Sequence, residues 1–403
     1  MSLPKNGRIV VIDDKHEQVL PLLKSLWQNG FATIYFNGEK KDLPSTPLDD
    51  IRVIFLDMEL ETGGYTGGSD NKTKAATTAR VLKSIINTQQ KVVYLIIMWA
   101  IHEELESNFW TYINTDSNCR FITLRLEKTK CINNPEIIPA EIAAVLRDHN
   151  AFKFFINWEN TIHKSSNNII LDFSSFFPVD SEWNKKILEV LKRLAEEYAG
   201  KNLNPVDHKQ IVRCAMLALN GTFVDSLENN IAKDTNPGIS FDGITAVPDN
   251  GVVAKINSKL LLDQNNTITK PGCIYANSEN DDIQEYFKKN HGNNLSENEK
   301  VFCEVSPTCD YAQQKWTCHR ILYGIKVPAG AAKLKKADYL HETPVFNLGE
   351  KSVKFVFDLR KLRSKNLGEL DSLRPLCTFR HDLLVDIQHK IASHCSRPGM
   401  VSL

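Results

Sequence analysis

Two short apolar runs that end in acidic residues constrain the fold of this chain most strongly. Residues 9–12 (Ile-Val-Val-Ile) precede Asp13 and Asp14, and residues 53–56 (Val-Ile-Phe-Leu) precede Asp57. Continuous apolar runs of this kind are typical of buried strands in a parallel sheet. The carboxyl ends of such strands form the binding edge of open α/β sheets, so we expect the three carboxylates to meet there. Their mutual repulsion favours a divalent cation, and Mg²⁺ prefers such hard oxygen ligands.

Residues 1–135 alternate between strand and helix patterns. Apolar residues at helical spacing predict a helix over 16–29, and residues 62–75, rich in Gly, Thr, Asn and Lys, predict a mobile loop. Five strands separated by helices predict an α/β domain with a doubly wound parallel sheet. The remaining elements we expect are strands at 31–36, 91–98 and 120–126 and helices at 76–86 and 102–113.

With Asp13 and Asp14 after its first strand and Asp57 after its third, the region of about 8–130 resembles a response-regulator receiver domain of the flavodoxin-like type. The resemblance implies that Asp13, Asp14 and Asp57 hold Mg²⁺ together with the main-chain carbonyl of Glu59. It also implies that Asp57 accepts a phosphoryl group from a histidine kinase, a phosphotransfer protein or a small phosphodonor, with Lys128 completing the site. The chemistry is sound by itself, because a carboxylate is a weak nucleophile and needs a cation to attack an anionic phosphoryl group.

Some positions depart from the receiver pattern. The family carries Ser or Thr as its switch residue at the end of the fourth strand, where this chain has Trp99 followed by Ala100. The lysine is followed by Thr129 instead of proline, and the loop after Asp57 is longer than usual. Two alternatives therefore stay open: a phospho-acceptor with an unusual output, or a scaffold with a pseudo-receiver that is not phosphorylated.

A phosphatase alternative rests on the residues after Asp57. The segment 57–62 superficially resembles the nucleophile motif of haloacid-dehalogenase-type phosphatases. In that motif the second acid protonates the leaving group, and Glu59 is one methylene longer than the acid required there. The acidic pair near residue 13 fits a receiver better.

Residues 136–235 predict an all-helical connector domain. Apolar residues recur at helical spacing over 139–147, 152–163, 183–199 and 208–227, and Gly200 is a helix stop signal. The aromatic residues around Trp158 are interpreted as a core stripe, and no residue here points to chemistry.

Residues 236–403 predict a β-rich output domain of unknown activity, which we expect to be an SH3-like barrel, with a helix over 380–394. Its segment 305–313 resembles a short pattern of poorly characterised bacterial proteins. Cys309, Asp310 and His319 form a speculative nucleophile or metal site there, although their spacing matches no standard zinc signature.

Composition limits the function classes. Lys and Arg number 49, as do Asp and Glu, so no net charge indicates a nucleic-acid or membrane partner. No apolar run has the length of a membrane span and no signal peptide is evident, while nine cysteines in so long a chain favour reduced thiols in the cytoplasm.

We therefore expect an atypical two-component response regulator, a cytoplasmic phosphoprotein that can form a homodimer and is not itself an enzyme. The alternative is a receiver-regulated hydrolase or nuclease whose site lies in the C-terminal domain.

Overall fold

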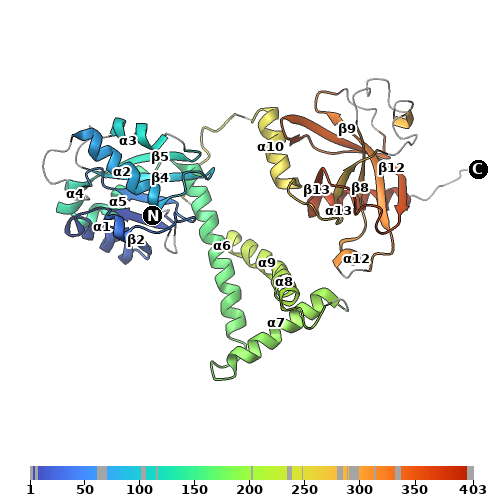
Figure 1. The fold of residues 1–403 in the computed structure, drawn as a ribbon, viewed down its shortest axis with the longest axis horizontal. Helices are drawn as coiled ribbons and strands as arrows, with labels where there is room; N and C mark the ends of the chain where they lie inside the picture. Colours follow the sequence, from blue (N-terminus) through green and yellow to red (C-terminus); the bar gives the residue numbers. More distant parts are fainter. Residues whose placement is uncertain are drawn as a thin grey trace, which may run out of the picture. The chain divides into compact units, whose positions relative to one another are not determined.

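The structure, a computed structural model, describes residues 3–4, 8–60, 70–100, 106–114, 117–200, 203–233, 238–246, 248–278, 285–287, 289, 299–312, 315–331 and 337–396. The chain forms two compact units (Figure 1). The N-terminal unit comprises Met1–Asp180 and Asn220–Ile244, and the C-terminal unit comprises Ser181–Leu219 and Thr245–Leu403. Each unit therefore takes its helices from two separate stretches of the chain.

A five-stranded parallel sheet forms the centre of the N-terminal unit. Its strand order is β2-β1-β3-β4-β5, so the order reverses between β1 and β3. This is the doubly wound arrangement expected from the alternating strand and helix patterns. The strands are β1 (Ile9–Ile12), β2 (Thr33–Phe36), β3 (Val53–Leu56), β4 (Val93–Ala100) and β5 (Arg120–Glu127).

Helices cover both faces of this sheet because alternate strand residues point to opposite sides. On one side, Ile9 and Val11 pack with α1, α5 and the start of α6. On the other side, Val10 and Ile12 pack with α2 and α3. The helices around this sheet, in chain order, are α1 (His16–Gln28), η1 (Lys40–Asp42), α2 (Asn71–Ile85), α3 (Glu106–Asn114), α4 (Lys128–Asn133), η2 (Pro135–Ile137) and α5 (Ile138–Val145).

Two of the predicted boundaries near the site change. Residues 71–75 belong to α2, not to a loop, because the Asp70 side chain accepts a hydrogen bond from the Thr73 amide and caps the helix; residues 61–69 lie outside the described residues. Strand β4 continues through Trp99 to Ala100, paired with β5.

A long helix extends the N-terminal unit. Helix α6 (Asn150–Ser174) packs against α9 (Asn220–Lys233), where Asn230 donates a hydrogen bond to Ser165 at 2.9 Å. Glu159 of α6 contacts Arg8 at 2.7 Å and Arg52 at 3.0 Å. These two arginines precede β1 and β3, so the ion pairs attach α6 to the amino ends of the strands that carry the acidic residues.

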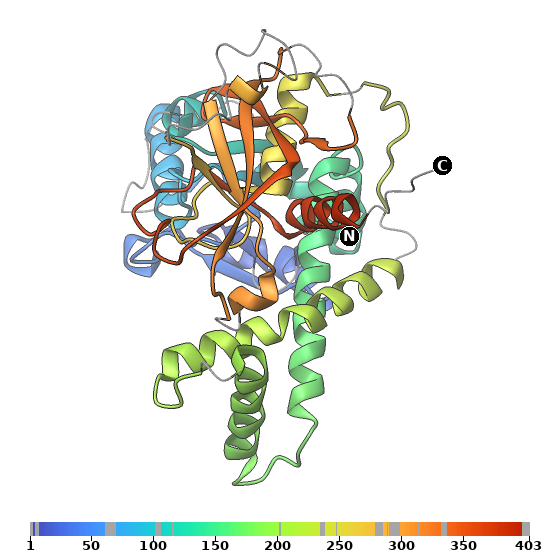
Figure 2. The same ribbon diagram turned by 90° about the vertical axis from the view of Figure 1, so that its right-hand side faces the viewer.

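The C-terminal unit contains a helical hairpin and a curled, largely antiparallel sheet (Figure 2). In the hairpin, α7 (Trp183–Ala199) ends at Gly200, whose φ is +61°, and α8 (His208–Ala218) packs against it through small residues. The pattern over 208–227 predicts one helix, but α8 and α9 form separate helices on either side of Leu219.

The C-terminal sheet has the order β10-β12-β9-β8-β7-β13-β6, with β11 paired to β12. The elements are α10 (Asn250–Leu261), β6 (Leu262–Asp263), β7 (Cys273–Ala276), β8 (Glu299–Glu304), α12 (Thr308–Ala312), β9 (His319–Pro328), β10 (Leu340–Glu342), β11 (Phe346–Leu348), β12 (Lys351–Lys365), β13 (Cys377–Phe379) and α13 (His381–Cys395). The β-rich prediction is confirmed, as is the final helix, while the SH3-like barrel stays a prediction.

Helix α10 contains the apolar run 252–256 and the first two residues of the run 260–262, in a region that the sequence predicts to be β-rich; Leu262 begins β6. The Asp249 side chain accepts a hydrogen bond from the Val252 amide, which caps a helix that buries Ala254 and Ser258, four residues apart. Among the described residues, no helix combines the length and the apolar character that a membrane span requires.

Candidate metal and phospho-acceptor site

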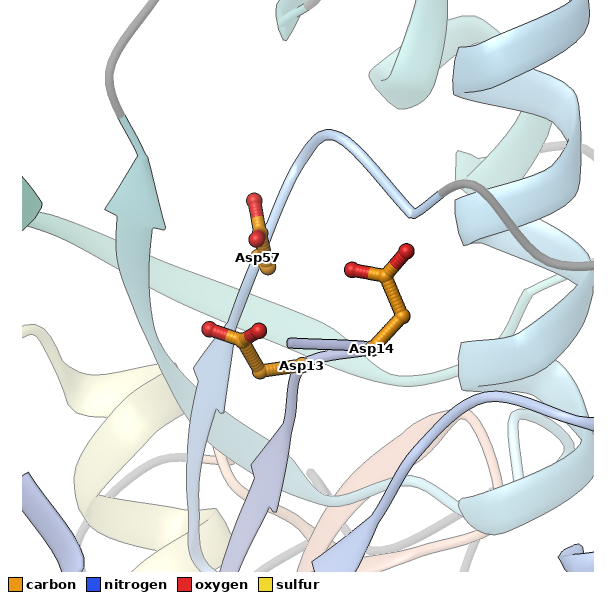
Figure 3. Close-up of side chains that lie close together, drawn as sticks. All are labelled: Asp13, Asp14 and Asp57. Atoms are coloured by element: carbon orange, nitrogen blue, oxygen red, sulfur yellow. The ribbon is translucent and has the colours of Figure 1, made fainter. Parts of the chain in front are cut away.

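The three predicted carboxylates meet at the carboxyl edge of the parallel sheet. Asp13 and Asp14 follow β1 and Asp57 follows β3, and these strands are paired so that Ile12 lies opposite Leu56. Each side chain offers one oxygen, and the three oxygens lie within 4.8 Å of one another (Figure 3). The edge is also the point where the strand order reverses, which is where open α/β sheets bind their ligands.

Lys128 reaches the same place from the end of β5. Its Nζ lies 2.7 Å from Asp13 Oδ2 and 2.6 Å from Asp57 Oδ2. The side chains of Lys128, Asp13 and Asp57 are 2%, 0% and 5% exposed, so this is a buried, charge-assisted network. Lys128 is the first residue of α4, directly after the strand from which the sequence predicts it.

Backbone groups orient the two aspartates. The Lys15 amide donates to Asp13 Oδ1 at 2.8 Å, and the Glu59 amide donates to Asp57 Oδ1 at 2.9 Å. The Asp57 amide donates to the Ile12 carbonyl at 2.9 Å, which continues the strand pairing up to the site. Each aspartate thus has one oxygen held by the backbone and one by the lysine.

Tyr35 is a residue of the site that sequence reasoning missed. Its hydroxyl donates to the Asp13 carbonyl oxygen at 2.6 Å, and burial together with the charges of Asp13 and Asp14 raises the pKa of this phenol to about 12. The signal was available, because Tyr35 lies on the strand paired with β1, opposite Val11.

Burial and charge act against each other in this site. Burial and the neighbouring charge of Asp57 raise the pKa of Asp13, although Lys128 opposes this shift. Burial lowers the pKa of Lys128, but the charges of Asp57 and Asp13 outweigh it and the net shift is upward. The set contains three carboxylates and one ammonium, so negative charge is in excess within it. A divalent cation with a preference for oxygen ligands, such as Mg²⁺, therefore fits this set of residues.

The remaining N-terminal site predictions have mixed outcomes. Glu59 is held next to Asp57 through its amide, while its carbonyl as a metal ligand stays a prediction. Trp99 is fully buried in the core layer shared with α1 and α5. Ala100 ends β4, and its side chain lies outside the described residues.

The C-terminal candidates do not form one cluster. Cys309 is exposed on α12, where its thiol lies 3.6 Å from Asp310 Oδ1. His319 is 2% exposed and packs edge-on against Trp316, with its Nδ1 3.9 Å from Glu304 Oε1. Within the described residues the aspartate set is the one group of possible metal ligands, and all nine cysteines are free thiols.

Glu304 is a buried carboxylate near His319 that the sequence analysis did not single out. The Ser306 hydroxyl donates to its carboxylate, as do the Ser306 amide at 3.2 Å and the Arg320 amide at 3.3 Å. Burial raises the pKa of Glu304 to about 7. The signal was an acidic residue inside an apolar run, Val301 to Val305. Through these hydrogen bonds Glu304 links the end of β8 to the start of β9, which gives segment 305–313 a structural role at its first residues.

Comparisons with known proteins leave the family of the chain open. No protein-family model matches the chain, and no curated protein matches it. Among solved structures, one match is the crystal structure of NtrX from Brucella abortus in complex with ADP, at 12% sequence identity and a TM-score of 0.17. The match covers 52% of this chain and 40% of that chain. At this identity and TM-score the match indicates neither a family nor a function for the chain.

Proposed function

We propose that the N-terminal unit is a phospho-accepting receiver in which Asp57 takes up a phosphoryl group with the help of Mg²⁺. The observation that carries this proposal is the position of Lys128, whose buried ammonium contacts both Asp13 and Asp57 at the edge where the strand order reverses. The fixed ammonium, together with a divalent cation held by the carboxylates, would offset the negative charge of an incoming phosphoryl group. Replacing a buried ion pair with apolar residues is often neutral or even stabilising, so the retention of these charges favours a role beyond folding.

The proposed reaction is transfer to a carboxylate oxygen of Asp57. That oxygen forms a bond to phosphorus, and the bond between phosphorus and the leaving atom of the donor breaks, so that acetyl phosphate releases acetate with the electron pair. Lys128 offsets the charge of the phosphoryl oxygens. Asp13, Asp14 and Asp57 would hold Mg²⁺, which would offset the repulsion between the two anions as they approach.

The donor that we propose is a phosphohistidine of a histidine kinase or phosphotransfer protein. Phosphoramidate carries the same phosphorus–nitrogen bond and serves as its small-molecule substitute. We further propose a cytoplasmic protein whose C-terminal unit is a non-standard output domain. Self-association of the receiver stays a prediction of the family resemblance.

A pseudo-receiver is the second candidate, and Trp99 is the observation that favours it. A fully buried indole stands where the receiver family has a small hydroxyl residue. In that case the aspartates would bind the cation without accepting a phosphoryl group.

One experiment distinguishes these candidates. The full chain is incubated with Mg²⁺ and acetyl phosphate or phosphoramidate, and its intact mass is measured for wild type, D57N and the control D148N, whose aspartate is exposed. We expect a phosphate-sized adduct in wild type and D148N that is absent in D57N and in EDTA. Mg²⁺ binding by calorimetry without any adduct would instead establish the pseudo-receiver, and an adduct that persists in D57N would place the acceptor elsewhere.

A further inference from the structure

Trp99 lies directly beside the proposed phospho-acceptor in the sheet. On β4, Met98 is opposite Leu56, the last residue of β3. Trp99 and Asp57 are the next residues, so continuing this register places them side by side. On its other side Trp99 is opposite Leu126 of β5, two residues before Lys128. The indole-bearing residue therefore lies between the acceptor and the lysine in the order of strands.

The pleat of the sheet places these residues on the same face. Side chains alternate along a strand, and Leu95, Ile97 and Trp99 all belong to the core layer shared with α1 and α5. In β3 that layer contains Val53 and Phe55, so Asp57 is the next residue on the same side. Leu126 of β5 belongs to the same layer, and Lys128 follows two residues later at the start of α4.

The indole N–H of Trp99 is a buried donor that has no acceptor within the described part of the chain. The residue is 0% exposed, and its Nε1 has no hydrogen-bond partner among the residues that the structure describes. Buried donors are almost always paired, because an unpaired one loses its bond to water without replacement. This unpaired N–H next to Asp57 is explained if the atom that accepts its hydrogen bond arrives with the phosphoryl group.

We propose that Trp99 donates this hydrogen bond to an oxygen of the phosphoryl group on Asp57, in place of the hydroxyl that the receiver family uses. This inference rests on the proposed function. A phosphoryl group has three terminal oxygens with negative charge. Lys128 can contact one oxygen and the cation another, and the Trp99 N–H provides a donor for the third. Trp99 is a positioning residue in this scheme, since it holds the group and takes no part in bond formation.

The test uses beryllium fluoride, which mimics the phosphoryl group on a carboxylate, with Mg²⁺ and the full chain. W99F removes the donor but keeps an aromatic ring. W27F is the matched control, because the Trp27 indole donates to Thr33 at 2.8 Å on an exposed part of the same unit. We expect W99F to bind beryllium fluoride roughly tenfold more weakly or worse, as for the loss of one hydrogen bond to a charged group. Its affinity for Mg²⁺ alone should not change, and W27F should match wild type in both measurements.

A second readout needs no variant that could misfold. In wild-type protein with ¹⁵N-labelled tryptophan, beryllium fluoride should move one of the indole N–H signals downfield, as a new charged acceptor does. Unchanged beryllium fluoride affinity in W99F, or saturation of wild type without such a shift, would overturn the role of Trp99 while leaving Asp57 as the acceptor. If wild type neither binds beryllium fluoride nor gains a phosphate-sized mass, this inference and the proposed function both fail.

Discussion

Replacing Lys128 with methionine tests the electrostatics of the site most directly. The Lys128 side chain is 2% exposed, and its ammonium lies 2.7 Å from Asp13 and 2.6 Å from Asp57. Methionine fills a similar apolar volume but carries no charge, so K128M leaves buried carboxylates facing one another without their cation. Removing one partner of a buried ion pair costs about 3–5 kcal/mol. We expect the N-terminal unit to lose this much free energy of unfolding in EDTA.

Mg²⁺ should restore part of the loss. A ligand that binds only the folded state stabilises it by about 2.7 kcal/mol at a hundred times its dissociation constant. Since K128M lacks the ammonium that partly neutralises the cluster, its carboxylates attract a divalent cation more strongly than those of wild type. The gain in stability on adding Mg²⁺ should therefore be larger for K128M than for wild type.

Hydrogen exchange by mass spectrometry measures this effect within the N-terminal unit. Core strands exchange through global opening, so peptides that cover β1 and β3 report the stability of that unit. With each 1.4 kcal/mol worth a factor of about ten, their protection should fall by roughly two to three and a half orders of magnitude in EDTA.

The control variant is K130M. Lys130 lies on the same short helix, but its side chain is 46% exposed and pairs with Glu141 at the surface. An exposed pair of this kind contributes at most about 1 kcal/mol. Equal protection in K128M and wild type, or an equal loss in K130M, would refute the reasoning that a buried charge network holds the site together.

Three further predictions concern groups outside this cluster. Burial raises the pKa of Glu304 from a usual 4.5 to about 7, so the folded state favours its neutral form. The contribution of this group to the free energy of unfolding, about 3 kcal/mol, is fully present below pH 4.5 and is lost as the pH rises through 7. E304Q should remove most of this slope in thermal melts between pH 5 and 8. E159Q should weaken both ion pairs that attach α6 and cost about 1–3 kcal/mol, seen as faster hydrogen exchange in α6. G324A should destabilise the C-terminal unit in urea unfolding, because a Cβ there would lie 2.4 Å from the Val356 carbonyl oxygen, while G330A, with open space around it, should not.

Each of these predictions has a contrary outcome. An E304Q variant with the same pH slope as wild type would mean that another group controls it. Unchanged exchange in α6 of E159Q would show that apolar packing alone holds the helix. Equal stability of G324A and wild type would mean that β9 and β12 can move apart without cost.

The strand ends of the site could be predicted because their signal is local. Buried strands of a parallel sheet appear as continuous apolar runs, and the acidic residue that ends each run marks the edge where ligands bind. For this reason Asp13, Asp14 and Asp57 were identified from their neighbours in sequence alone. The same local logic identified α7, which ends at Gly200, and the final helix α13.

Helix α10 shows where a local signal was insufficient. Its apolar residues occur in runs short enough for strands, and period alone does not separate the two structures at this length. The side chain of Asp249, which caps the helix, and contacts with β11 decide the outcome. Glu304 was missed because its burial and its contact with the Arg320 amide arise only when β8 pairs with β9.

The sequence by itself thus determined which carboxylates meet and on which edge of the sheet, since both follow from periodicity and strand order. The family resemblance already implied Lys128 at the site. Only the tertiary structure decided that its ammonium contacts both Asp13 and Asp57, because Lys128 is separated from them by 115 and 71 positions. It also decided that Trp99 is buried, with an indole donor that finds no acceptor among the residues described, and that Glu159 holds the far ends of the same two strands. Interactions of this kind depend on register and burial, which short-range patterns do not encode.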